Sequence, residues 1–154
     1  MKEYTKEQCI KDTEEHIDNV KGYMHNIMDL IYERSMKHDA SKLQEPELGI
    51  FVEYTPKLAN TTYGSDEYKE HLKGMQVALD HHYENNSHHP EHYDNGINGM
   101  SLLDIVEMLC DWKAATERHN DGDIMKSMEI NKERFGIDDQ LYEILLNTIK
   151  ELGM

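Results

Sequence analysis

Apolar residues recur at the helical period along every long segment of this chain, and no segment gives a convincing strand pattern. Thr5 and Gln8 form a capping-box pattern at the start of the longest such segment. This segment is predicted to be a helix that ends around Ser35 and Met36. Its apolar stripe consists of Ile10, Ile17, Val20, Met24, Ile27 and Ile31.

Turn and capping residues divide the middle of the chain. A short helix is expected after Pro46, and Pro56 is expected to stop it. Residues 59–64 have the composition of a loop, and Ser65 is expected to cap a third long helix. Residues 85–87, Asn-Asn-Ser, are expected to break that helix.

The last third of the chain continues in the same way. Residues 95–99 are expected to form a loop, and Ser101 to cap a helix from Leu102 to about Arg118. The sequence then predicts a turn at Asp121-Gly122-Asp123, a helix ending near Phe135-Gly136, and a last helix capped by Asp138. These patterns predict an all-α fold of about five to seven helices in one domain spanning residues 1–154.

Composition limits the partners. Acidic residues outnumber Lys and Arg by 31 to 16, which gives a formal net charge of −15 and argues against a nucleic-acid polymer as partner. No segment reaches the ~20 apolar residues of a membrane span, and the N-terminus resembles neither a signal nor a transit peptide. Two distant cysteines, Cys9 and Cys110, suggest buried thiols in a reducing compartment. A cytoplasmic protein without a membrane partner is expected, and oligomerisation stays open.

The chain also carries an ordered set of metal-ligand types. His16 comes first, His38-Asp39 follows, two histidine pairs lie at 81–82 and 88–89, and Asp111 comes last. A single His-Asp pair is common and carries little information, but this order could hold one or two metal ions in a helical domain. On the first helix His16 is favoured over His25, because His16 flanks the apolar stripe.

The middle histidines leave two choices. His82 lies on the apolar stripe of its expected helix and His81 does not, so His82 is favoured as the ligand. Pro90 biases His89 away from helix, which places both His88 and His89 on an extended loop with either ring able to turn inward. A solvated histidine-rich loop is the alternative for the whole segment.

Asp111 lies in an otherwise apolar segment and would need a charged partner if buried, which a metal ion could supply. Asp104 and Glu107 share its helical face and are interpreted as the solvated side of that helix. Arg118, two turns further along, could contact a phosphate oxygen or form a surface ion pair.

Imidazole and carboxylate ligands without thiolate favour a hard or borderline divalent cation, namely Mn, Fe, Ni, Co, Mg or Zn. A closed structural zinc site would normally use cysteine. Protons compete with the cation for imidazole, so metal loss is expected as the pH falls through about 6.5.

These residues resemble the HD-domain superfamily of metal-dependent phosphohydrolases over about residues 16–118. The resemblance rests on His16-x-x-x-Val20, on His38-Asp39-Ala40-Ser41-Lys42, and on Asp111 in its apolar helix. The chain is most similar to phage and bacterial HD-like proteins with His-Asp-x-Ser-Lys, His-His-Pro-Glu-His-Tyr and Asp-Trp motifs, which implies the host cytoplasm if the chain is phage-encoded.

The resemblance implies an HD-like helical bundle and a phosphohydrolase acting on a small phosphate ester, such as a nucleotide or cyclic nucleotide. Metal-activated water would attack the phosphorus atom. Asp39 would bridge two metals and Lys42 would contact a phosphate oxygen. Arg118 could also contact a phosphate oxygen, and His89 or Glu91 could protonate the leaving group. The metal ligands would be His16, His38, Asp39, His82, His88 and Asp111.

Two other functions use the same sequence features. Some HD-like proteins hold two irons and cleave C–C or C–P bonds with O₂, and ligand order does not separate them from phosphohydrolases. A non-enzymatic phage accessory protein, with metal as a structural staple, is the third possibility. Its support is the acidic surface and a set of tyrosines that could form a recognition patch, Tyr54, Tyr63, Tyr68, Tyr83 and Tyr93.

Overall fold

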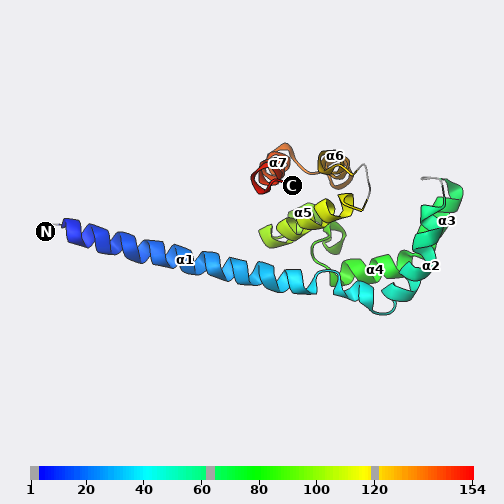
Figure 1. Ribbon diagram of the computed structural model, residues 1–154, viewed down its shortest axis with the longest axis horizontal. Helices are drawn as coiled ribbons and strands as arrows, with labels where there is room; N and C mark the ends of the chain where they lie inside the picture. The colour runs from blue at the N-terminus through cyan, green and yellow to red at the C-terminus, as the bar shows by residue number, and fades with distance from the viewer. Residues whose placement is uncertain (1–3, 62–64, 119–121) are drawn as a thin grey trace. The chain divides into compact units, whose positions relative to one another are not determined.

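The computed structural model describes residues 4–61, 65–118 and 122–154, and it is all-α over these residues (Figure 1). The all-α prediction is therefore confirmed. The chain divides into two compact units, Met1–Lys37 and His38–Met154, which are described separately below.

The first unit contains one unbroken helix, α1, at Lys6–Lys37. The backbone N–H of Gln8 donates to Thr5 Oγ1 at 3.2 Å, so Thr5 is the expected N-terminal cap. The helix ends with Arg34 and Lys37 in its last turn, where positive charge is favourable beside the free carbonyl groups. The expected end at Ser35 and Met36 is correct to within two residues.

The second unit begins with a 3₁₀ turn, η1 at Ala40–Leu43, followed by α2 at Glu47–Ala59. The expected stop at Pro56 is wrong, because α2 continues through this residue. Pro56 supplies no N–H to the carbonyl of Val52, but it lies in the last turn, where only one helical hydrogen bond is lost.

The expected third helix is two helices, α3 at Asp66–Gly74 and α4 at Gln76–Asn85, both packed against α2. Ser65 caps α3 as expected, accepting a hydrogen bond from the Tyr68 backbone N–H. A Cβ atom at Gly74 would lie 2.3 Å from the Tyr54 ring, so glycine allows α2 to approach closely at this break.

Two further 3₁₀ turns, η2 at Pro90–His92 and η3 at Gly96–Gly99, occupy the segment before α5 at Leu102–Thr116. Helix α5 ends two residues before the expected position at Arg118. Ser101 and Asp104 form a reciprocal capping box at its start, as the side chain of each residue accepts from the other's backbone N–H.

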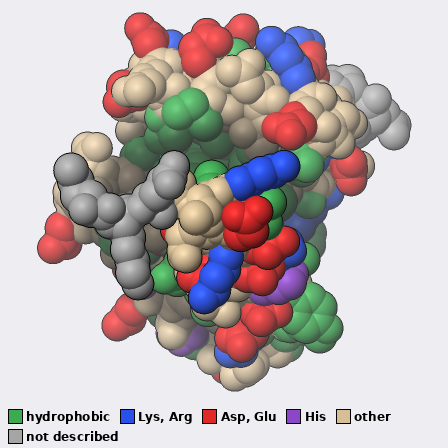
Figure 2. Space-filling model, turned by 90° about the vertical axis from the view of Figure 1, so that its left-hand side faces the viewer, with side chains coloured by type: hydrophobic (Ala, Val, Ile, Leu, Met, Phe, Trp, Pro, Cys, Tyr) green, Lys and Arg blue, Asp and Glu red, His purple; other side chains and the backbone are tan. Residues whose placement is uncertain are grey.

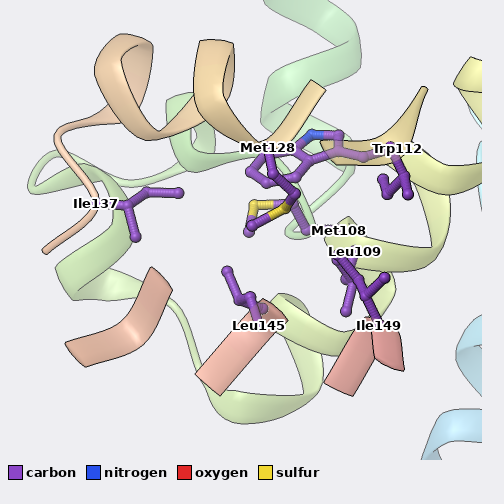
Figure 3. Close-up of a cluster of buried hydrophobic side chains, with 8 residues drawn as sticks. Met108, Leu109, Trp112, Met128, Ile137, Leu145 and Ile149 are labelled. Carbon is purple, nitrogen blue, oxygen red and sulfur yellow. The ribbon is translucent and has the colours of Figure 1, made fainter. Parts of the chain in front are cut away.

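Helices α6 at Ile124–Phe135 and α7 at Asp139–Leu152 complete the second unit. Asp123 and Asp138 cap them, while Asp121, the first residue of the expected turn, lies outside the described residues. Helices α5, α6 and α7 enclose the apolar core shown in Figure 3. Its buried residues are Met108, Leu109, Trp112, Ile124, Met128, Ile137, Leu145 and Ile149.

Met128 has 0% of its surface exposed, so Met128→Ala would leave a cavity that the surrounding side chains do not fill completely. We expect a loss of about 2–5 kcal/mol in the free energy of unfolding, measured by chemical denaturation. Ile130 on the same helix is 66% exposed, and Ile130→Ala is the matched control with an expected change within about 0.5 kcal/mol. Equal losses for the two variants would contradict this description of the core.

Acidic and basic side chains are interspersed on the surface, as Figure 2 shows for one face.

The expected burial of the cysteines is wrong, because Cys9 and Cys110 are both exposed free thiols. Cys110 is exposed because α5 turns Leu109 and Trp112 towards the core instead. None of the helices in the described part of the chain combines the length and apolar character needed to cross a bilayer.

Candidate metal centre

His38 and Asp39 lie at the start of the second unit, directly before η1. Asp39 has φ 55° and ψ 15°, a left-handed conformation that is costly for most residues and tolerated by Asp. Lys42 on η1 donates to Asp39 Oδ2 at 2.6 Å. This local geometry fixes the direction of the Asp39 carboxylate, with one oxygen held by Lys42.

Helix α4 contributes His82, which is 2% exposed. Its Nδ1 lies 2.9 Å from Oε2 of Glu47, a fully buried residue in the first turn of α2. The other Glu47 oxygen lies 2.7 Å from Nδ1 of His81. A carboxylate only accepts hydrogen bonds, so we assign the ring proton of His82 to Nδ1 and a free lone pair to Nε2.

The loop after α4 contributes His88 and His89. Asp104 anchors this loop to α5, because it accepts hydrogen bonds from Ser87 Oγ at 2.7 Å and from the Tyr93 hydroxyl at 2.9 Å. Asp104 is 3% exposed, and hydrogen bonds from Ser101, Ser87 and Tyr93 hold its pKa far below the ordinary value although burial alone would raise it. The interpretation of Asp104 as a solvated residue is wrong.

Helix α5 also contributes Asp111 and Glu107. Glu107 Oε1 lies 2.9 Å from His38 Nδ1 and 3.2 Å from His88 Nδ1. A carboxylate that accepts from Nδ1 orients the ring and leaves Nε2 as the ligating atom, as is common for metal-binding histidines. Glu107 is therefore not a solvated residue, and the corresponding interpretation is wrong as well.

Among residues 4–61, 65–118 and 122–154, three overlapping sets of side chains bring their ligand atoms within 4.8 Å of one another. We call their union the cluster. The sets are Asp39, His82, His88 and His89; His38, His88 and Glu107; and His38, Asp39 and Asp111.

Two buried polar atoms of the cluster have no hydrogen-bond partner among the described residues. These atoms are Asp39 Oδ1 and His88 Nε2, and they lie 3.5 Å apart. Both carry lone pairs if Nδ1 of His88 donates to Glu107. Two facing lone pairs without a partner are unfavourable in a buried environment, and a cation between them would satisfy both.

The spacing of the donor atoms also suits a divalent cation. Donors bound at about 2.0–2.2 Å to one ion lie about 3.0–3.5 Å from each other. His82 Nε2 lies 3.4 Å from Asp39 Oδ1 and 2.9 Å from His89 Nε2. The cluster can therefore hold a metal ion.

The pKa values of the histidines in the cluster are shifted in opposite directions. The Asp111 carboxylate, together with Glu107 and Asp39, raises the pKa of His38 to about 9 against the opposing effect of burial. Burial together with His88 and His82 lowers the pKa of His89 to about 3. Burial likewise lowers the pKa of His82 and of His88. Neutral imidazoles, which can bind metal directly, are thus concentrated on one side.

Five of the six expected metal ligands lie in the cluster, namely His38, Asp39, His82, His88 and Asp111. His16 lies on α1, in the first unit. The three sets use only residues of the second unit. The assignment of His16 as a ligand stays a prediction.

The expected catalytic residues are distributed differently. Lys42 lies beside Asp39, and His89 belongs to a set of potential ligands. Glu91 instead forms an ion pair with Arg134 of α6 at 2.7 Å, so it is not brought into the cluster. Arg118 is exposed just beyond the end of α5.

The expected tyrosine patch is only partly described. Tyr63 lies outside the described residues. Tyr54 contacts Lys57 and His71, Tyr83 contacts His89, and the Tyr93 hydroxyl binds Asp104. The tyrosines described by these contacts serve packing and loop anchoring.

Sequence reasoning missed Glu47 and set Glu107 aside. Glu107 is four residues before Asp111, so both side chains lie on one face of α5, and this spacing was an available signal. Glu47 follows Pro46 in the first turn of a helix, where acidic residues are common on exposed surfaces. Only the packing of α2 against α4 reveals its role.

The described residues thus form an all-α protein with a candidate metal centre. A model of a family of unknown function (DUF5662) matches residues 5–151, and the chain belongs to that family. Neither curated proteins nor solved structures give a match to the chain.

Glu47→Gln tests the orienting role of this buried carboxylate. Glutamine keeps the shape but offers only one accepting oxygen to two histidine rings, so His82 loses its fixed orientation. We expect metal affinity to fall by about 10–100-fold, measured by equilibrium dialysis. Glu53→Gln on the same helix removes an exposed ion pair with Lys57 and should leave affinity unchanged. Equal affinities for both variants would contradict the role of Glu47.

Proposed function

We propose that this protein is a metal-dependent phosphohydrolase acting on a small phosphate ester, such as a nucleotide or cyclic nucleotide. The observation that carries the proposal is the pair of buried, unpartnered atoms, Asp39 Oδ1 and His88 Nε2, which face each other beside Lys42. The resemblance of His38-Asp39-Ala40-Ser41-Lys42 to the HD signature supports the reaction class.

The residues that would hold divalent cations are His38, Asp39, His82, His88, His89 and Asp111. Bound divalent cations would supply an activated water and neutralise charge on the phosphoryl oxygens. Glu107 and Glu47 orient the rings of His38, His88 and His82 through Nδ1. The protein therefore keeps the Nε2 atoms of these three histidines directed at one region.

Lys42 is the cation best placed for substrate. Its side chain is 35% exposed and its ammonium group contacts Asp39, so a substrate that approaches from solvent can reach Lys42 beside the cluster. An ammonium group at this position can bind a phosphate oxygen and stabilise negative charge that develops on it. Because His89 belongs to a ligand set and Glu91 pairs with Arg134, we assign neither as the leaving-group acid.

The test begins with the protein purified without added metal and analysed for its elemental content. Nucleoside monophosphates, cyclic nucleotides and simple phosphomonoesters are then supplied with Mn, Fe(II), Co, Ni, Mg or Zn. We expect turnover of at least one phosphate ester that a chelator removes and added metal restores. Absence of turnover with every fully loaded metal would overturn the proposal, as would O₂ consumption without phosphate-ester cleavage.

A further inference from the structure

The two oxygens of the Asp39 carboxylate belong to ligand sets of different composition. Oδ1 lies 3.4 Å from His82 Nε2 and 3.5 Å from His88 Nε2, and His89 completes this set. We call Asp39, His82, His88 and His89 the histidine site. It offers three imidazoles and one carboxylate.

The other oxygen faces a set richer in oxygen. Asp39 Oδ2 lies 3.6 Å from His38 Nε2, which in turn lies 3.6 Å from Asp111 Oδ1. We call His38, Asp39 and Asp111 the carboxylate site. It offers one imidazole and two carboxylates.

These donor sets favour different ions. Imidazole suits borderline transition ions such as Fe, Co, Ni and Zn, whereas carboxylate oxygen suits harder ions such as Mg and Mn. Burial differs too: the His82 and His88 side chains are 3% and 1% exposed, whereas those of His38 and Asp111 are 30% and 22% exposed. Water therefore competes more strongly for an ion in the carboxylate site.

Lys42 adds a second difference between the sites. Its Nζ donates at 2.6 Å to Asp39 Oδ2, the oxygen that belongs to the carboxylate site. A fixed positive charge at this distance opposes the binding of a second cation to the same oxygen. No comparable cation contacts Asp39 Oδ1, which has no hydrogen-bond partner among the described residues.

We infer that the cluster contains two unlike cation sites that share Asp39. One is a tight histidine site for a borderline transition ion, and the other is a weaker carboxylate site for a harder ion, whose occupancy is limited by competition with the ammonium group of Lys42. The inference rests on the metal binding contained in the proposed function and not on hydrolysis.

The test is metal binding to the full-length protein after chelation, measured by equilibrium dialysis with elemental analysis. Co²⁺ and Mn²⁺ are used first separately and then together. We expect one tight and one weaker equivalent of Co²⁺, at least about tenfold apart in affinity. With both ions present, we expect one Co²⁺ and one Mn²⁺ per chain, and the Co²⁺ visible absorption spectrum should show nitrogen-rich coordination.

Three variants separate the sites. His89→Ala should weaken the first equivalent, and Asp111→Asn should weaken the second equivalent while sparing the first. Lys42→Met should tighten the second equivalent by at least about tenfold and the first by a clearly smaller factor, because the ammonium group contacts only the oxygen of the carboxylate site. Lys57→Met is the matched control, because it also removes an ion pair with a carboxylate, at 2.7 Å, but on the surface of α2. Circular dichroism melting confirms that each variant is folded.

Two equivalents of equal affinity, a single equivalent, or a second equivalent weakened or unchanged by Lys42→Met would each overturn the inference. The proposed function fails separately. Two unequal sites without hydrolysis of any phosphate ester would leave the inference standing and remove the hydrolase. Hydrolysis by a protein with two equal sites would do the reverse.

Discussion

Asp39→Asn is expected to abolish the binding of both cations and with it all metal-dependent hydrolysis. Asp39 is the residue common to the histidine and carboxylate sites, and within the described parts of the chain it alone provides an oxygen to both. Asparagine keeps the size of the side chain and tolerates the left-handed backbone at φ 55°, so the change removes mainly the negative charge. Affinity for Co²⁺ and Mn²⁺ should fall by more than about a hundredfold in equilibrium dialysis.

Asp39→Ala should give the same result with an added loss of stability, because alanine is strained in the left-handed region. Asp80→Ala is the matched control, since Asp80 is an exposed residue of α4 whose carboxylate contacts only the exposed Gln76 in the described structure. Hydrolysis that survives in Asp39→Asn or in Asp39→Ala would exclude the mechanism proposed for this site.

Much of the fold was predictable because it depends on local signals. The caps Thr5, Ser65, Ser101 and Asp138 accept hydrogen bonds from backbone N–H groups as their positions predict. The break between α3 and α4 was not predictable. At this break Gly74 lies against the Tyr54 ring of α2, a contact with another helix that the sequence does not reveal.

The site was predictable to the extent that its ligands follow the chain in a recognisable order. His82 could be chosen over His81 because it lies on the apolar face of its helix. The choice between His88 and His89 could not be made, because a loop has no period, and the structure places both in the histidine site. Glu47 required knowledge of which helix packs against α4.

The buried carboxylates show why an acidic sequence can form a site for neutral imidazole. Glu47 and Asp104 are buried and Glu107 is partly buried, and all three contact the histidines or the loop that carries them. The acidic composition by itself suggested only a solvated surface. The residues that orient the ligands are thus the ones least distinguishable from surface residues in the sequence.

The affinity of the carboxylate site is expected to rise about tenfold for each pH unit from about 6.5 to 9, while that of the histidine site stays constant. Asp111 and Glu107 raise the pKa of His38 to about 9, so at neutral pH a cation must displace the His38 proton. Burial lowers the pKa of His82, His88 and His89, so these rings are already neutral at pH 7. Equilibrium dialysis with Mn²⁺ and Co²⁺ at pH 6 to 9 measures both affinities.

The same shifts determine the stability of the metal-free protein. The pKa of His38 is higher in the folded state than the ordinary value of about 6.5, so its stabilising effect is complete below about pH 6.5 and is lost as the pH rises through about 9. The lowered pKa values of His82, His88 and His89 act in the opposite direction, because folding resists their protonation below about pH 6.5. Chemical denaturation in the presence of chelator should therefore show falling stability both above and below this pH.

The sequence alone predicts that every histidine loses metal in acid. A parallel decline of the metal affinities of both sites through about pH 6.5 would support that simpler expectation and contradict the division into two sites.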